Sequence, residues 1–253
     1  LKEAIVGGEQ HEDIAKIYRE MGTVHWKSGD NEQAITCFSK AQSIYNSLPG
    51  DVNAANASIV SCFLGVVRYS SGDLDQALCD LEISLKGVEA FFGPLHSKTL
   101  RVYRKLAELA LEKAKRSMAD RNVKLQGMRL GDDRDESGEE KEHDQTDLLM
   151  KKAIYLYREL LKRQLTYYNE ESEQVAVTYE ILGDAYTMQD EYLKASMMFK
   201  KAHDIFMELF GGEDQRTAAA ALKLEEANNV ISSQEIDILY DSDDISKNGS
   251  VFE

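Results

Sequence analysis

Residues that could hold a metal ion gather in one acidic segment. Five of them have the spacing of positions 1, 3, 5, 6 and 12 of a twelve-residue calcium-binding loop: Asp133, Asp135, Ser137, Gly138 and Asp144. The match is incomplete, because Asp144 replaces the bidentate glutamate and Lys141 adds a positive charge at a ligand position. Glu140 also stands where an apolar residue belongs. The segment is therefore predicted to be a solvated acidic loop, with no bound metal or cofactor.

Motifs for catalysis are absent from the sequence. It contains no glycine-rich phosphate loop, no H-E-x-x-H, no Cys-His pairing and no G-x-S-x-G. The five histidines are scattered, and His11 and His96 stand where helices are expected to begin. We interpret these two as helix caps and predict that the chain is not an enzyme.

Charge and cysteine usage restrict the partners and the compartment. The net charge of −15 argues against nucleic acid, which needs a basic face. Residues 132–144 hold eight acids against two bases, and 234–253 hold six against one. Cys37, Cys62 and Cys79 have no C-x-x-C spacing and are expected to be free thiols in the cytoplasm or the nucleus. No apolar run is long enough to predict a membrane partner.

A repeated pattern indicates the elements that position these residues. A small residue recurs at Gly22, Gly65, Ala107 and Gly183. In three copies an alanine follows twelve residues later, and an aromatic residue or leucine follows four after that: Ala34 and Phe38, Ala77 and Leu81, Ala195 and Phe199. Ser-Gly-Asp or Gln-Asp-Glu separates the two parts, which predicts a turn with a helix cap. Each copy is therefore predicted to be a hairpin of two helices.

The third copy is interrupted. Its second helix, with Ala153, Tyr157 and Leu160, begins about 34 residues late. The register then resumes, because Ala153 and Ala195 are again 42 residues apart. The acidic segment is thus predicted to be a loop inserted in one repeat.

The pattern resembles the tetratricopeptide-repeat (TPR) consensus. The period of 42 to 43 residues and the junctions at Gly8–His11, Gly93–His96 and Gly212–Gln215 resemble the long repeats of kinesin light chain. The resemblance implies an all-α, right-handed TPR superhelix with one acidic loop insertion and a disordered tail. That family's paired asparagines for peptide binding are missing, since Arg19-Glu20-Met21 and Glu180-Ile181-Leu182 stand there. Thr23 replaces the asparagine of the carboxylate clamp in chaperone-binding members.

The expected organisation has seven parts. These are the end of a preceding repeat and a junction (1–13), TPR 1 (14–50), TPR 2 (51–92), TPR 3 (93–168, with the insertion at about 115–146), TPR 4 (169–212), a capping helix (213–233) and an acidic disordered tail (234–253).

The resemblance also implies a concave groove lined by the first helix of each repeat. Counting from the small residue predicts that these side chains bind peptide segments of partner proteins: Lys16, Arg19, Thr23, Trp26, Lys27, Tyr69, Arg101, Arg104, Glu108, Glu180 and Asp184. The groove is basic and aromatic towards its N-terminal half, which favours acidic–aromatic peptides. One such segment is the chain's own tail at 236–244, with Leu239 and Tyr240 as anchors.

Two alternatives to this scaffold or adaptor function stay open. An acidic insertion that splits a TPR resembles the histone chaperones of the NASP type, so the insertion would bind histones or other basic proteins. The chain could instead be a regulatory arm of a larger enzyme.

Overall fold

The computed structural model describes the backbone of residues 11–128, 136–168 and 170–248, and the side chains of 11–124, 145–168 and 170–234. This part of the chain is helical and has no strand. Its helices are α1 (Glu12–Lys27), α2 (Asn31–Ser47), α3 (Asp51–Ser70), α4 (Leu74–Phe92), α5 (Ser97–Met128), α6 (Glu136–Tyr167), α7 (Glu173–Thr187), α8 (Tyr192–Phe210) and α9 (Gln215–Asn248).

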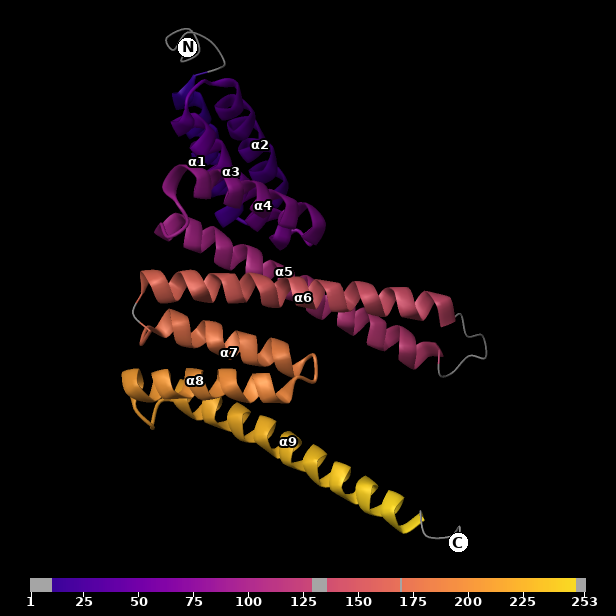
Figure 1. Ribbon diagram of the computed structural model, residues 1–253. Helices are drawn as coiled ribbons and strands as arrows, with labels where there is room; N and C mark the ends of the chain where they lie inside the picture. The colour runs from indigo at the N-terminus through magenta and orange to yellow at the C-terminus, as the bar shows by residue number, and fades with distance from the viewer. Residues whose placement is uncertain (1–10, 129–135, 169, 249–253) are drawn as a thin grey trace. The chain divides into compact units, whose positions relative to one another are not determined.

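The chain divides into two compact units, Leu1–Arg163 and Gln164–Glu253. In the first unit, α1 packs on α2 and α3 on α4, and the hairpins are joined by contacts of α2 with α3 and of α4 with α5 (Figure 1). In the second unit, α7 packs on α8, and α8 packs on α9. The all-α class and the paired helices predicted from the repeat pattern are confirmed.

The predicted turns form for the reasons that their residues suggest. Gly29 and Gly72 have φ of +84° and +88°, where a side chain would be strained. The carboxylates of Asp30 and Asp73 then accept hydrogen bonds from the backbone N–H groups three residues later, each at 3.1 Å. In the hairpin of α7 and α8, Asp190 takes the positive φ of 58° in place of a glycine.

The recurring small residues allow the two helices of a hairpin to approach each other. A Cβ atom on Gly22 would lie 2.9 Å from the ring of Phe38, and one on Gly65 would lie 2.8 Å from the side chain of Leu81. Real Cβ atoms essentially never come so close to a neighbour. Each of these hairpins therefore needs glycine opposite the large residue that follows sixteen positions later.

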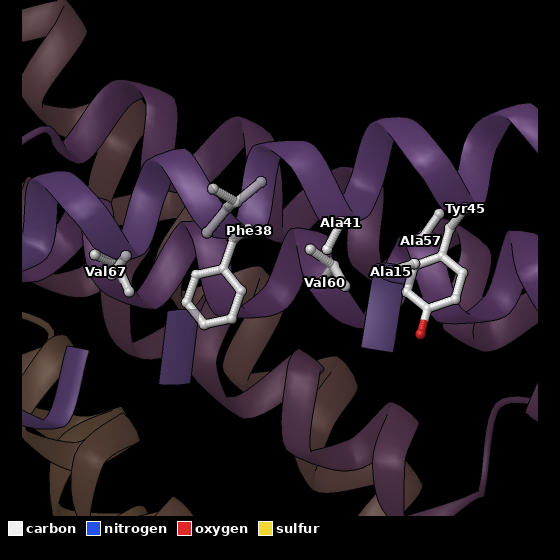
Figure 2. Packing of buried hydrophobic residues seen from close by; sticks show 9 residues of the cluster. Ala15, Phe38, Ala41, Tyr45, Ala57, Val60 and Val67 are labelled. Atoms are coloured by element: carbon white, nitrogen blue, oxygen red, sulfur yellow. The ribbon is translucent and has the colours of Figure 1, made fainter. Parts of the chain in front are cut away.

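A continuous apolar core joins the first two hairpins. Phe38, Ala41 and Tyr45 of α2 are fully buried between α1 and α3. Figure 2 shows these side chains with Ala15 of α1 and with residues of α3. The rings of Phe38 and Phe63 stack with centroids 5.3 Å apart. This core fixes α1 and α3 side by side.

The junctions between hairpins repeat one hydrogen bond. The buried hydroxyl of Thr99 donates to the carbonyl oxygen of Gly93 at 2.7 Å, and that of Thr217 donates to Gly211 at 2.9 Å. Both glycines have a positive φ, +86° and +80°. Gly93 therefore leads into α5 in the way that Gly211 leads into α9.

Three helices extend beyond the boundaries expected from the sequence. Helix α5 continues to Met128 and α6 begins at Glu136, so both enter the segment 115–146 that was expected to be a loop. Helix α9 continues to Asn248, although the capping helix was expected to end at 233. Residues 213–248 contain no glycine or proline to end a helix, and 115–126 are equally free of both. Local helix propensity therefore accounts for the extensions of α5 and α9.

Candidate protein-binding surface

The predicted groove residues of the first unit lie on α1, α3 and α5. Helix α3 contacts α1 and also contacts α5, so the three first helices form one layer. We call this surface the first-helix face. It consists of Cys62 of α3 and the predicted groove residues of these helices, all exposed or half-buried: Lys16, Arg19, Thr23, Trp26, Lys27, Tyr69, Arg101, Arg104 and Glu108.

Two basic side chains of α1 lie near a buried phenol. Burial raises the pKa of the Tyr45 hydroxyl, and the nearby charges of Arg19 and Lys16 partly offset that rise. This hydroxyl is buried and has no hydrogen-bond partner in the described part of the chain. Lys16 pairs with Glu12 at 2.9 Å, and Arg19 pairs with Glu20 at 2.8 Å. Both of these ion pairs are local to α1.

The remaining predicted residues of α1 differ in exposure. Thr23 donates its hydroxyl hydrogen to the carbonyl oxygen of Arg19 at 3.0 Å, so its side chain serves the helix itself. Trp26 is half-buried and packs against the core beneath, while Lys27 is exposed. Trp26 thus has an apolar contact below and a solvent-facing part above, which is an arrangement common for interface tryptophans.

The charges of α5 come close to α3 across the face. Burial raises the pKa of the Cys62 thiol, and the positive charges of Arg101 and Lys105 partly offset that rise. Among the described residues, Arg101 and Arg104 form no hydrogen bond or ion pair. Tyr69 of α3 is 42% exposed. The middle of the face therefore presents two arginines without a partner in the described chain and an aromatic ring.

Glu108 follows the basic residues Arg101, Arg104 and Lys105 of α5. Its carboxylate accepts a hydrogen bond from the Lys105 amine at 2.7 Å. Burial raises the pKa of the Tyr157 hydroxyl, the negative charge of Glu108 adds to the rise, and Arg104 opposes it. Glu108 and Arg104 therefore both lie near the second helix of their own repeat.

In the second unit, the two predicted groove residues already have a partner. The Lys223 amine of α9 donates to Glu180 at 2.8 Å and to Asp184 at 2.9 Å. Burial alone would lower the pKa of Lys223, but the hydrogen bonds and charges of the two carboxylates outweigh it and leave the pKa raised. The single positive charge of Lys223 therefore partly offsets the charge of this acidic pair of α7.

Sequence reasoning missed Lys105 and Lys223, although a signal was present. Each lies twelve residues after a junction glycine, Gly93 or Gly211, on the first turns of the next helix. Cys62 and Glu180 likewise stand at one shared position, three residues before Gly65 and Gly183. A lysine at this register therefore lies near the preceding first helix: the charge of Lys105 acts on the Cys62 thiol, and Lys223 donates hydrogen bonds to carboxylates.

The remaining predictions about chemistry concern helix caps, cysteines and metal ligands. His11 and His96 are helix caps as predicted, since their Nδ1 atoms accept backbone hydrogen bonds from Asp13 at 3.2 Å and Lys98 at 3.1 Å. Cys37, Cys62 and Cys79 are free thiols. Within the described residues, no group of His, Cys, Asp or Glu could hold a metal ion. The calcium-loop residues and the tail anchors Leu239 and Tyr240 lie outside the described side chains.

Hydropathy along the helices gives one further finding. Over the range that the structure describes, none of them is both long enough and apolar enough to cross a bilayer.

Comparison with known proteins agrees with the fold. A family model of the tetratricopeptide repeat matches residues 13–82. No curated protein matches the chain. Two similar solved structures are a putative kinesin light chain of Podosopora anserina with nearly identical TPR-like repeats (13% identity, TM-score 0.61, 96% of this chain and 100% of that one) and BtubC (BKLC) of P. vanneervenii (16%, 0.60, 96% and 83%). The apo form of RapI is also similar (14%, 0.59, 89% and 67%).

The fold and the surface indicate the class of protein. Stacked helix hairpins with small residues at fixed spacing are a scaffold for protein interaction. The chain has the tetratricopeptide-repeat fold, with residues 13–82 matching the family model and with an overall likeness to kinesin-light-chain-like structures.

Proposed function

We propose that the first-helix face binds peptide segments of partner proteins and that acidic segments with an aromatic residue fit it best. The observation that carries the proposal is the pair Arg101 and Arg104, which lack a hydrogen bond or ion pair among the described residues although the chain has a net charge of −15. Arginine and aromatic residues are enriched in interfaces, and an unpaired arginine fork suits a carboxylate. The activity is binding, without catalysis.

Affinity for designed peptides tests this proposal. A panel of extended peptides with the same aromatic anchor and either acidic, neutral or basic flanks is titrated by fluorescence anisotropy. We expect the acidic peptides to bind most tightly, and Arg101→Glu with Arg104→Glu to weaken them at least about tenfold. The binding should also weaken with salt, because exposed charges are screened.

A matched control distinguishes the effect of the two arginines on the first-helix face from the effect of a change in net charge. Lys86→Glu with Lys200→Glu changes the net charge by the same amount on the second helices, where both lysines are exposed. This variant should keep the affinity within about twofold. Equal losses in both variants, or equal binding of acidic and basic peptides, would reject the proposed groove. Tight binding of basic peptides would instead favour the chaperone alternative based on the acidic insertion.

A further inference from the structure

One apolar stripe is exposed on a side of α1 away from the first-helix face. Ile17, Met21 and Val24 are 43%, 44% and 66% exposed. Ile17 lies five residues before the small residue Gly22, and Met21 lies one residue before it. Val24 lies two residues after Gly22. Spacing of four and three residues places all of them on one side of the helix. We call Ile17, Met21 and Val24 the outer α1 stripe.

The same three positions are buried in the first helices α3, α5 and α7. Counting from Gly65, Ala107 and Gly183 gives side chains that are at most 5% exposed: Val60, Leu64 and Val67 of α3, Val102, Leu106 and Leu109 of α5, and Thr178, Leu182 and Ala185 of α7. The stripe is therefore an interface position of the repeat, and in α1 it lacks a cover within the described residues.

The next repeat shows which helix covers these three positions. Val60, Leu64 and Val67 belong to one core with Phe38, Ala41 and Tyr45 of α2, the second helix of the preceding hairpin (Figure 2). Helix α4 packs on α5 in the same order, and α8 packs on α9. In these cases the helix that covers the three positions is the second helix of the preceding repeat.

Helix α9 is built differently from the first helices of the hairpins. Because Thr217 matches Thr99 at the junction, Glu225 of α9 stands at the register of Ala107, where a second helix requires a small residue. Glu225 and Asn228 are both exposed there. A charged, extended side chain at the point of closest approach blocks a further helix. The register of α9 at Glu225 therefore differs from that of the helices that begin a hairpin, whereas the register of α1 is the same as theirs.

The residues that lead into α1 point to the same occupant. Gly7-Gly8-Glu9 repeats Gly211-Gly212-Glu213, the junction that connects α8 to the helix it covers. His11 caps α1 as His96 caps the start of α5, which follows its own covering helix. In the sequence, this junction is therefore the one that elsewhere follows a covering helix.

We propose that the outer α1 stripe docks the second helix of a further tetratricopeptide repeat, joined to α1 through Gly7-Gly8. The occupant presents a small residue and large apolar side chains to Ile17, Met21 and Val24, as α2 does to α3. The repeat that begins with α1 is thus an internal repeat by its packing and not an end cap.

A fusion protein tests the docking directly. Residues 173–210, which form α7 and α8, replace residues 1–6, so that Phe210 is followed by Gly7-Gly8-Glu9. Trp26 is the only tryptophan of the chain and lies on α1, so its fluorescence reports melting of the first unit alone. We expect the fusion to raise this melting temperature by at least about 3 °C, because it buries the stripe.

Two variants decide whether the stripe is responsible. Met21→Glu with Val24→Glu should leave the melting of the unfused chain nearly unchanged, since both positions are exposed, and should abolish the gain in the fusion. Val52→Glu with Ile83→Glu, at positions 58% and 50% exposed elsewhere in the unit, should keep the gain. No gain in the fusion, or a gain that persists when it carries Met21→Glu with Val24→Glu, overturns the proposal.

Sedimentation of the unfused chain distinguishes a second copy as occupant. We expect a monomer whose mass does not depend on concentration. A dimer that Met21→Glu with Val24→Glu dissociates would show that two α1 helices cover each other, and it would overturn the proposed occupant.

Discussion

The ring of Phe199 fills the space that a side chain on Gly183 would need. A Cβ atom on Gly183 would lie 2.4 Å from Cε1 of Phe199, closer than the corresponding contacts of Gly22 and Gly65. Both residues are buried, so neither can turn into solvent. This contact sets the distance between α7 and α8.

Gly183→Ala should therefore destabilise the second unit. Overpacking of this kind costs about 1–3 kcal/mol, more than the gain of up to about 1 kcal/mol in helix propensity. Chemical denaturation followed by circular dichroism measures the change. Adding Phe199→Leu, the residue type found at Leu81, should recover part of the loss; a Gly183→Ala chain as stable as the parent would contradict the close packing.

Asp214 should make stability depend on pH at the start of α9. Its carboxylate accepts hydrogen bonds from the Arg216 side chain and backbone at 2.9 Å, and these hold the pKa of Asp214 below its ordinary value of 3.8. A lowered acid pKa contributes stability above pH 3.8, and this contribution is lost as the pH falls through the lowered value. Asp214→Asn should thus lower the melting temperature at pH 7, with a difference that shrinks towards pH 2.

The neighbouring Glu213→Gln is the control for that titration. Glu213 is exposed. The difference in melting temperature between Glu213→Gln and the parent should therefore be the same at pH 7 and at pH 2. A difference between Asp214→Asn and parent that stays constant from pH 7 to pH 2 would show that the Asp214 carboxylate is not stabilised in the folded chain.

Lys223→Met should expose repulsion between Glu180 and Asp184. The lysine pKa is raised in the folded chain, so its contribution is fully present below the ordinary value of 10.5 and is lost as the pH rises through the raised value. At neutral pH we expect a loss of about 1 kcal/mol by denaturation. The triple variant with Glu180→Gln and Asp184→Asn should regain most of it. Additive effects of the three changes would argue against the pairing.

Replacing residues 121–144 with a short Gly/Ser linker should leave the hairpins folded. The buried side chains nearest the insertion, Ala114 and Thr146, lie outside the replaced range, as does the hydrogen bond between Ser117 and Thr146. Loop length itself costs little free energy. Thermal melting should change by only about 3 °C. A fall of tens of degrees would show that the insertion packs on the repeats.

Local features of the fold were predictable from the sequence. Gly22, Gly65 and Gly183 indicate a close approach because only glycine lacks the Cβ atom that would collide with the large residue sixteen positions later. Gly29 with Asp30 likewise predicts a turn and a cap within four residues. His11 and His96 were recognisable as caps for the same reason, since each acts on a backbone group two residues away.

Partners distant in the sequence required the tertiary structure. Lys223 meets Glu180 and Asp184 across 43 and 39 residues, and only the stacking of α9 beside α7 brings them together. Arg101 and Arg104 could be placed on a face by counting, but whether they were paired depended on their neighbours in space.

The sequence by itself determined the repeat, its turns and its caps, because these depend on steric and hydrogen-bonding rules that act over a few residues. The tertiary structure decided burial. Ile17, Met21 and Val24 have the same apolar character as Val60, Leu64 and Val67, yet the first set is exposed and the second is covered by α2. Burial depends on which helix lies against a face, and that is a property of the packed chain and not of the local pattern.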